Sequence, residues 1–296
     1  MASVDCAVRS ADPLGESPLW CPRTRRLWWV DVHAPSLQSF DPASGAHDAL
    51  PQPGRSLGCI ALRRAGGFVL AGDGALDAFD PATGARAPLI DLEPDRADIR
   101  LNDGKADPRG RLWIGSMSAD AFVPVGRLHR VGPGEAASDP TTTALLHGII
   151  VPNSIAFAPD GRTFYFADTR RYAIWAWDLD LDDGVIANRR LFADTTGRPG
   201  RPDGSCIDAE GCLWNAEYAG GRIVRYAPDG RIDRVVALPV SHPTCVAFGG
   251  DRLETLYVTS AAQALTPAER AAEPLAGALL ALDVGVAGRP EPMVGF

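Results

Sequence analysis

The feature that most constrains the fold is a short apolar motif that recurs at nearly even intervals along the 296 residues. Each copy carries an aromatic residue in a run such as LWWVD, FVLAG or LYVTS, and most copies follow a turn. The markers lie 40 to 52 residues apart, at Trp28, Phe68, Trp113, Tyr165, Trp214 and Tyr257. Such an interval holds four short strands, the size of one β-propeller blade. The sequence therefore predicts an all-β fold, a six-bladed β-propeller with a central channel, as a single domain over residues 1–296.

Composition narrows the classes of function. The net charge of −8 and the absence of a Lys and Arg cluster argue against a nucleic-acid surface. No signal peptide and no long apolar run is visible, so we expect neither a membrane partner nor secretion. The six cysteines lack a CxxC pair, which is typical of free thiols in the cytoplasm; a bridge between Cys206 and Cys212 is the alternative. No heptad pattern suggests an oligomer, so we expect a monomer.

Four polar residues occupy the same place in their repeats, 11 or 12 residues before the aromatic marker. They are Glu16, Asn102, Asn153 and Asp203, and each begins the run expected to form the innermost strand. Repeat symmetry places them on one ring at one end of the channel. A turn role explains any one of them, but four at one register are better explained by a shared site.

The crowding of these side chains predicts a metal site at that end of the channel. Two carboxylates and two amides repel and desolvate each other unless a cation lies among them. Because every candidate ligand offers oxygen, the site suits one hard divalent ion such as Ca²⁺, Mg²⁺ or Mn²⁺, and Zn²⁺ stays open.

The motifs around these positions resemble those of a known family. LGESPLW, RLNDGKADPRGRLWIGSM, VPNSIAFAPDGRTFYFADT and RPDGSCIDAEGCLWNA are similar to motifs of the gluconolactonase, regucalcin and senescence-marker-protein family of six-bladed propellers.

The resemblance implies roles for individual residues. Glu16, Asn153 and Asp203 would bind the divalent metal, while Arg100 and Asn102 would bind the hydroxyls or ring of a sugar lactone. Family members with the vertebrate pattern carry a second substrate-contacting Glu, and this chain has Asp120 in its place.

These parts together predict metal-dependent hydrolysis of an aldonolactone to the aldonic acid. The cation would polarise the lactone carbonyl for attack by water, with Asp203 as the candidate general base. Two alternatives stay open. One is a non-catalytic propeller that binds calcium or a protein partner, and the other is a hydrolase of another ester class, such as phosphotriesters.

Three further sequence features are weaker evidence about the function. GRSLG at 54–58 fits a nucleophile elbow but lacks the strand and helix that an elbow needs, so Ser56 is expected at most to line the pocket. DLDLDDG at 178–184 resembles a calcium loop but lacks its glycine and glutamate, and is better explained as a hairpin turn. Lys105, the single lysine, indicates a need for a compact ammonium, with Asp103 and Asp107 as candidate partners.

Two residues near the expected channel mouth have an ordinary structural explanation. His242 and Tyr218 fall at the ends of predicted strands, where an aromatic or imidazole ring is more often packed than functional. We therefore expect packing at the core or rim, with a place in the pocket wall as the alternative.

Overall fold

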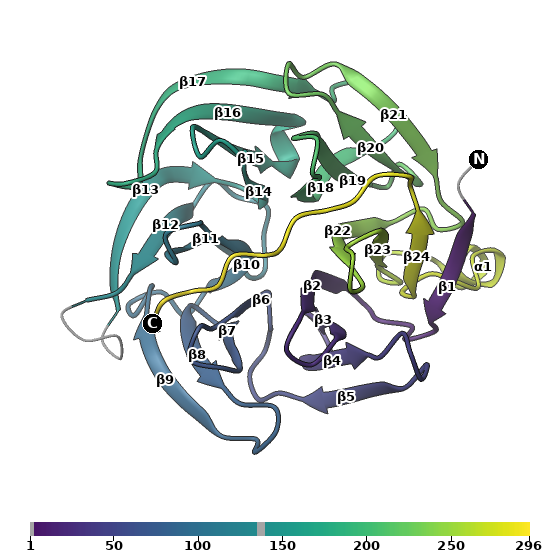
Figure 1. The fold of residues 1–296 in the computed structure, drawn as a ribbon, viewed down its shortest axis with the longest axis horizontal. Helices are drawn as coiled ribbons and strands as arrows, with labels where there is room; N and C mark the ends of the chain where they lie inside the picture. Colours follow the sequence, from purple (N-terminus) through teal and green to yellow (C-terminus); the bar gives the residue numbers. More distant parts are fainter. Residues whose placement is uncertain (1–2, 135–139) are drawn as a thin grey trace.

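The computed structural model of the chain describes residues 3–134 and 140–296, which form six four-stranded antiparallel sheets. Figure 1 shows the sheets arranged as blades around a central axis. The helices of the described residues are η1 (Thr169–Arg171) and α1 (Pro267–Ala272), and neither has the length and apolarity to cross a membrane. The predicted six-bladed β-propeller is confirmed.

Each blade runs outward from the channel in four strands. The innermost strands are β2 (Gly15–Cys21), β6 (Cys59–Leu62), β10 (Ile99–Ala106), β14 (Pro152–Phe157), β18 (Arg201–Ile207) and β22 (Pro243–Gly249). The second strands are β3 (Arg26–Asp31), β7 (Phe68–Ala71), β11 (Leu112–Ser118), β15 (Thr163–Asp168), β19 (Leu213–Tyr218) and β23 (Thr255–Ser260). The third strands are β4 (Ser36–Phe40), β8 (Ala75–Phe79), β12 (Gly126–Gly132), β16 (Ala173–Asp180), β20 (Arg222–Tyr226) and β24 (Leu279–Asp283). The outermost strands are β5 (His47–Pro51), β9 (Arg86–Asp91), β13 (Thr141–Ile149), β17 (Val185–Asp194), β21 (Ile232–Ala237) and β1 (Val4–Val8).

The recurring aromatic residue lies on the second strand of every blade and joins neighbouring blades. Trp28 packs on Phe68 of the next blade with ring centroids 4.9 Å apart. Trp113 lies 4.8 Å from Phe164 of the following blade in the same way. Twisted sheets that radiate from an axis leave wedges between them, and large rings fill these wedges at the density of a protein core. This packing explains why the aromatic marker repeats once per blade.

The two ends of the described chain close the ring. β1, near the N-terminus, pairs with β24 as the outermost strand of the last blade, with Val4 opposite Leu282. Figure 1 shows the C-terminal segment crossing the ring from β24 to the opposite side. There the Val294 N–H donates to the Leu62 carbonyl at 2.8 Å, and Phe296 is buried.

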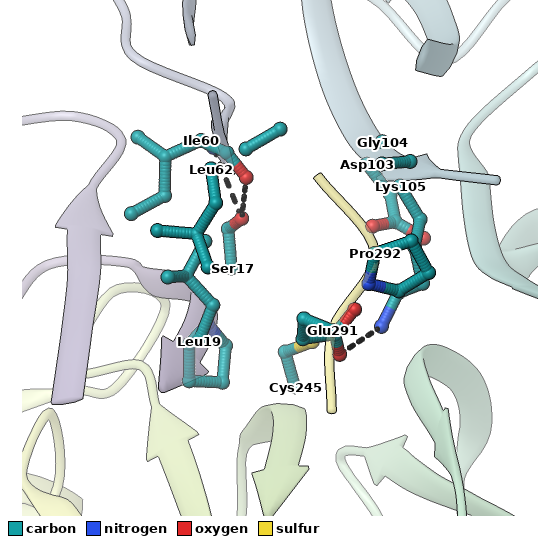
Figure 2. A pocket seen from close by; sticks show the side chains of 13 residues that line it. Ser17, Leu19, Ile60, Leu62, Asp103, Gly104, Lys105, Cys245, Glu291 and Pro292 are labelled. Carbon is teal, nitrogen blue, oxygen red and sulfur yellow. Dashed lines mark hydrogen bonds and ion pairs between the residues drawn. The ribbon is translucent and has the colours of Figure 1, made fainter. Parts of the chain in front are cut away.

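This C-terminal segment covers the end of the channel opposite the predicted ring of polar residues. Figure 2 shows Glu291 and Pro292 beside Lys105 in a small cavity there. Lys105 Nζ lies 3.1 Å from the Glu291 carboxylate and donates to the Ser205 carbonyl at 3.3 Å. Glu291 raises the pKa of Lys105 against the effect of burial. The predicted pairing with Asp103 or Asp107 was wrong, because the partner comes from a distant segment.

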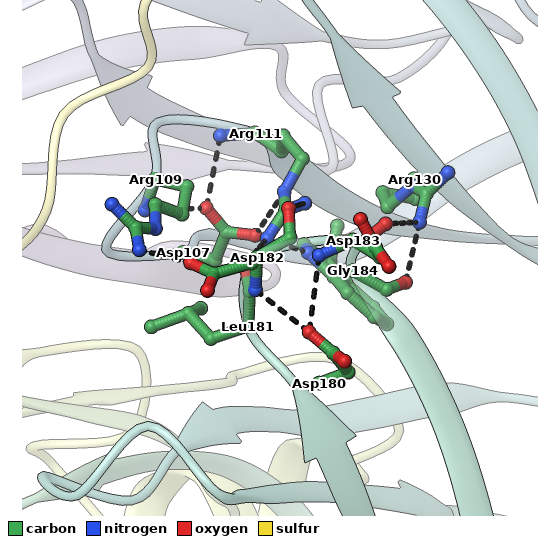
Figure 3. Close-up of polar contacts among 10 residues, drawn as sticks. Asp107, Arg109, Arg111, Arg130, Asp180, Leu181, Asp182, Asp183 and Gly184 are labelled. Carbon is green, nitrogen blue, oxygen red and sulfur yellow. Dashed lines mark hydrogen bonds and ion pairs between the residues drawn. The ribbon is translucent and has the colours of Figure 1, made fainter.

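Residues 178–180 of the DLDLDDG segment end β16, and residues 181–184 form the turn to β17, so the predicted hairpin turn is confirmed. Figure 3 shows three arginines of the preceding blade around it. Arg111 Nη1 donates to the Asp182 carbonyl at 3.1 Å, Arg130 bonds the carbonyls of Asp183 and Gly184, and Arg109 pairs with the Asp182 carboxylate. The oxygens of the turn therefore accept from guanidinium groups that join two blades.

All six cysteines are free thiols, and five of them are buried. Cys206 and Cys212 therefore do not form the disulfide that the sequence left open as an alternative. The buried thiols of Cys206 and Cys245 have raised pKa values because burial disfavours the thiolate.

A buried aspartate organises the turn before the second strand of the fifth blade. Asp208, which is fully buried, accepts from the backbone N–H groups of Glu210 and Cys212 at 3.0 Å. Trp214 Nε1 and Arg225 Nε donate to its other oxygen at 2.9 and 2.8 Å. One carboxylate thus links the turn, the marker tryptophan and the third strand.

Replacing this carboxylate should destabilise the whole propeller. In Asp208→Asn, the amide nitrogen faces hydrogen-bond donors, and Arg225 loses one buried acidic partner. We therefore expect the free energy of unfolding to fall by about 3 kcal/mol. Thermal unfolding followed by circular dichroism should show Tm lower by roughly 6–12 °C. The matched control is Asp229→Asn in the exposed β20–β21 turn, where the aspartate side chain accepts from Arg231 and from no other described residue, so Tm should move little. Equal shifts in both variants would contradict this account.

Candidate active site

The innermost strands of five blades are interrupted by a β-bulge at one common register. The ladder shifts between Glu16 and Leu19, Leu101 and Gly104, Asn153 and Ala156, Pro202 and Ser205, and Pro243 and Val246. Such a bulge bends the strand and re-aims its side chains. At two of them Ser17 and Ser154 adopt left-handed φ angles of 52° and 57°. Asn102 and Asp203 lie within the bulged segments, and Glu16 and Asn153 are the last paired residues before theirs, so all four stand where the ladder breaks.

The four ring residues line one pocket, as the repeat register predicted. Glu16, Asn102, Asn153 and Asp203 are between 3% and 8% exposed, and the pocket has a volume of about 410 Å³. The remaining lining residues are Leu14, His33, Phe122, Val151, Thr169, Arg170, Arg201, Tyr218, His242, Gln263 and Ala264. A concave site of this size with a few converging polar groups suits a small molecule.

A chain of hydrogen bonds orients the two amides. Arg100 Nη1 donates to Asn102 Oδ1 at 2.7 Å, and Asn102 Nδ2 donates to the Pro152 carbonyl at 2.8 Å and to Asn153 Oδ1 at 3.2 Å. Asn153 Nδ2 donates to Thr169 Oγ1 at 2.8 Å. Because its nitrogen is engaged by Thr169, Asn153 presents its amide oxygen toward Asn102 and the pocket.

A second network supports the backbone of Asp203. Its carbonyl accepts from Ser154 Oγ at 2.7 Å and from Asn215 Nδ2 at 2.9 Å. Ser205 Oγ joins both donors, at 2.7 Å from Ser154 Oγ and 3.0 Å from Asn215 Nδ2. These bonds hold the main chain of Asp203 and do not use the oxygens of its carboxylate.

Burial and neighbouring negative charge disfavour the ionised form of both carboxylates of the pocket. Burial raises the pKa of Glu16 to about 8, and the nearby Asp103 carboxylate adds to the rise. Burial and the charge of Glu16 raise the pKa of Asp203 well above its usual value. Arg100 lies near both, yet burial lowers its pKa to about 10, and it donates to Asn102 instead of pairing with either acid. A cation among these oxygens would relieve the repulsion.

The donor set fits a hard divalent cation. Glu16 and Asp203 offer carboxylate oxygens and Asn153 an oriented amide oxygen, all in a desolvated setting. Among residues 3–134 and 140–296, no three His, Cys, Asp or Glu side chains gather as a metal cluster. The donor set of the pocket consists of two acids and one amide, so its fit to a cation depends on Asn153.

Three other predicted residues lie outside the pocket wall. Arg100 is buried behind Asn102, which lines the pocket. Asp120 is exposed, in the loop after β11 that carries Phe122, and its substrate role stays a prediction. Ser56 is buried and bonds Asp73 Oδ1 at 2.7 Å, so it takes no part in the pocket.

Tyr218 and His242 both line the pocket and pack on each other. Their ring centroids lie 4.6 Å apart, and His242 Nδ1 bonds Ser241 Oγ at 2.7 Å. Burial lowers the pKa of His242. The packing expected from the sequence and the alternative place in the pocket wall therefore both apply.

Several pocket residues were not predicted from the sequence because they lie on loops or strand ends. Thr169 and Arg170 belong to η1, which has no equivalent in the repeat, and Phe122 lies on an irregular loop. One signal was present: Arg201 stands two residues before Asp203, as Arg100 stands two residues before Asn102. Applying the same spacing to both motifs would have found Arg201.

Comparisons with known proteins agree with this geometry. The family model described as SMP-30/Gluconolactonase/LRE-like region matches residues 14–262. A 6-deoxy-6-sulfogluconolactonase of Pseudomonas putida is 36% identical over 98% of both chains. A pentonolactonase of Haloferax volcanii is 34% identical over 98% of this chain and 97% of its own. A crystal structure of regucalcin, described as a calcium-binding protein, from Agrobacterium tumefaciens has a TM-score of 0.94 and 33% identity, covering 100% of this chain and 98% of its own. The chain therefore belongs to the SMP-30/gluconolactonase family.

Proposed function

We propose that this protein hydrolyses a sugar lactone to the corresponding aldonic acid, with one divalent cation held by Glu16, Asn153 and Asp203. The observation that carries the proposal is the buried pocket in which two mutually repelling carboxylates and an oriented amide oxygen converge. Relatives named as lactonases for hexono- and pentonolactones, similar over nearly the whole chain, support the substrate class.

Asn102, Asp203 and the cation have separate roles in the proposed reaction. Asn102, fixed by Arg100, would bind ring or hydroxyl oxygens of the lactone beside the ligand set. Asp203, whose carboxylate is free of the network on its backbone, would take the proton of the attacking water. A bound divalent cation supplies polarisation of the lactone carbonyl and stabilisation of the developing negative charge.

The two alternatives that the sequence left open are less well supported. A calcium-binding or partner-binding propeller needs no pocket of about 410 Å³ beside the ligand set, although the regucalcin relative is described as calcium-binding. A phosphotriester hydrolase finds no counterpart among the two lactonases and the regucalcin named above. The single domain, the monomeric state and the cytoplasmic location stay predictions.

Metal binding should be stoichiometric and should release protons. At pH 7 the raised pKa of Glu16, about 8, means that this acid carries a proton without metal, and a cation must expel it. Titration calorimetry of chelator-stripped protein with Ca²⁺, Mg²⁺, Mn²⁺ or Zn²⁺, in buffers of different ionisation enthalpy, should show at least about one proton released per ion. Because proton and metal compete, and the pKa of Asp203 is raised as well, affinity should fall as the pH is lowered below 8, by about tenfold or more per pH unit.

The ligand assignment is tested by matched variants in the same titration. Glu16→Gln and Asp203→Asn should each weaken metal binding by about 100-fold or more, because each removes a charged ligand. Glu254→Gln, at an exposed acid paired with Arg252, should bind metal like the wild type. Unchanged binding in Glu16→Gln would remove that residue from the set.

Lactone hydrolysis should depend on the same residues. A pH-indicator assay on pentono- and hexonolactones, corrected for spontaneous opening, should show turnover that is lost after chelation and restored by one of the four metals. Asp203→Asn, assayed at a metal concentration that saturates it, should lose about 100-fold or more in kcat if Asp203 is the base. Full turnover by a metal-loaded Asp203→Asn would reject the base role, and turnover without any metal would reject the metal-dependent mechanism.

A further inference from the structure

Two arginines of the pocket have no acidic partner among the described residues. Arg170 and Arg201 both line the pocket, and both are half-buried. The neighbouring Arg171 behaves differently: its Nε lies 3.0 Å from Asp168 Oδ2, and it lines another surface hollow. Two guanidinium groups without an ion pair in one pocket call for a functional reason.

Aromatic rings hold both guanidinium groups in place. Arg170 lies over the Phe122 ring, with its guanidinium carbon 3.6 Å from the ring centroid. Arg201 lies over Tyr218, its cross-strand partner in the β18–β19 pair, at 5.5 Å. Stacking of this kind orients the planar guanidinium while its N–H groups stay available to oxygen acceptors.

The two groups also repel each other. Burial and the charge of Arg201 both lower the pKa of Arg170. Two guanidinium groups kept near each other in a pocket are at their most stable when an anion lies between them. The chain as a whole has a net charge of −8, so this positive region is local to the pocket.

The charge of Arg201 partly offsets the raised pKa of Asp203, but among the described residues neither acid of the pocket forms an ion pair with Arg170 or Arg201. Glu16 and Asp203 lie at the buried floor and are the proposed ligands of a divalent cation, whose two charges offset theirs. Both arginines are more exposed than these acids, and Arg170 lies beside Phe122, which is 60% exposed. The pocket therefore combines a floor for the reacting carbonyl with a positively charged rim.

We propose that Arg170 and Arg201 bind an anionic substituent of the substrate, a carboxylate, sulfonate or phosphate remote from the reacting carbonyl, so that the preferred substrate is an acidic sugar lactone. This inference rests on the proposed lactone hydrolysis and specifies the substrate class. Guanidinium groups bind all three anions through paired charge-assisted hydrogen bonds, so the rim selects negative charge and the assay must distinguish the anions.

The test compares gluconolactone with its analogues that carry a terminal carboxylate, phosphate or sulfonate, using metal-loaded protein. For the wild type, kcat/KM should be about tenfold or more higher for at least one acidic lactone than for the neutral one. The analogue with the highest value identifies the anion. The preference should weaken as NaCl is raised, since salt screens the interaction.

Variants at the rim assign the preference to the two arginines. Arg170→Gln and Arg201→Gln should each lower the ratio of kcat/KM for acidic over neutral lactone by about tenfold, and the double variant should abolish the preference. Arg171→Gln is the matched control: it removes a neighbouring charge that faces another partner, and the ratio should stay at the wild-type value. Titration calorimetry with glucarate and gluconate measures binding without turnover. Glucarate should bind more tightly than gluconate to the wild type, and this difference should require both Arg170 and Arg201.

The outcomes separate this inference from the function on which it rests. Hydrolysis of neutral lactone with no acidic preference, or a preference that survives in the double variant, overturns the inference and leaves the lactonase function standing. Failure to hydrolyse any lactone, neutral or acidic, overturns the proposed function, and the inference falls with it.

Discussion

The structure depends on one geometric constraint, the closure of six twisted sheets around a common axis. Closure needs bulky rings in the wedges between blades, which Trp28 and Trp113 help to provide, and it brings the innermost strands into contact around the channel. Five of the six innermost strands carry a bulge at one register, and these bulges turn side chains into the opening. The polar ring is thus a product of closure as much as of the residues themselves.

This constraint explains which parts could be predicted from the sequence. Glu16, Asn153 and Asp203 stand 11 or 12 residues before a repeating aromatic residue, so repeat symmetry sufficed to place them in one pocket. Arg170 and Phe122 lie on segments without a repeat, where no register applies. Glu291 was missed as the partner of Lys105 because 186 positions separate the two, and only the path of the C-terminal segment joins them.

The pocket has two layers of different origin. Inner strands supply the floor, where hydrogen bonds orient each side chain, so the chemistry of the site belongs to the propeller scaffold. Loops and strand ends supply most of the rim, including Arg170 of η1. Connecting segments tolerate change more readily than packed strands do. This division allows members of one family to keep a common reaction while differing in the molecule on which they act.

Closure of the last blade by β1 also bears on how the protein is made. A ribosome releases β1 early, whereas its partner β24 and the segment around Val294 are released late. β1 therefore stays without its partner strand, and the far end of the channel stays open, until β24 and the segment around Val294 have left the ribosome. Pocket residues from Glu16 to Asp203 reach their final arrangement after that moment, and a chain that stops within the last blade should need a chaperone or be degraded.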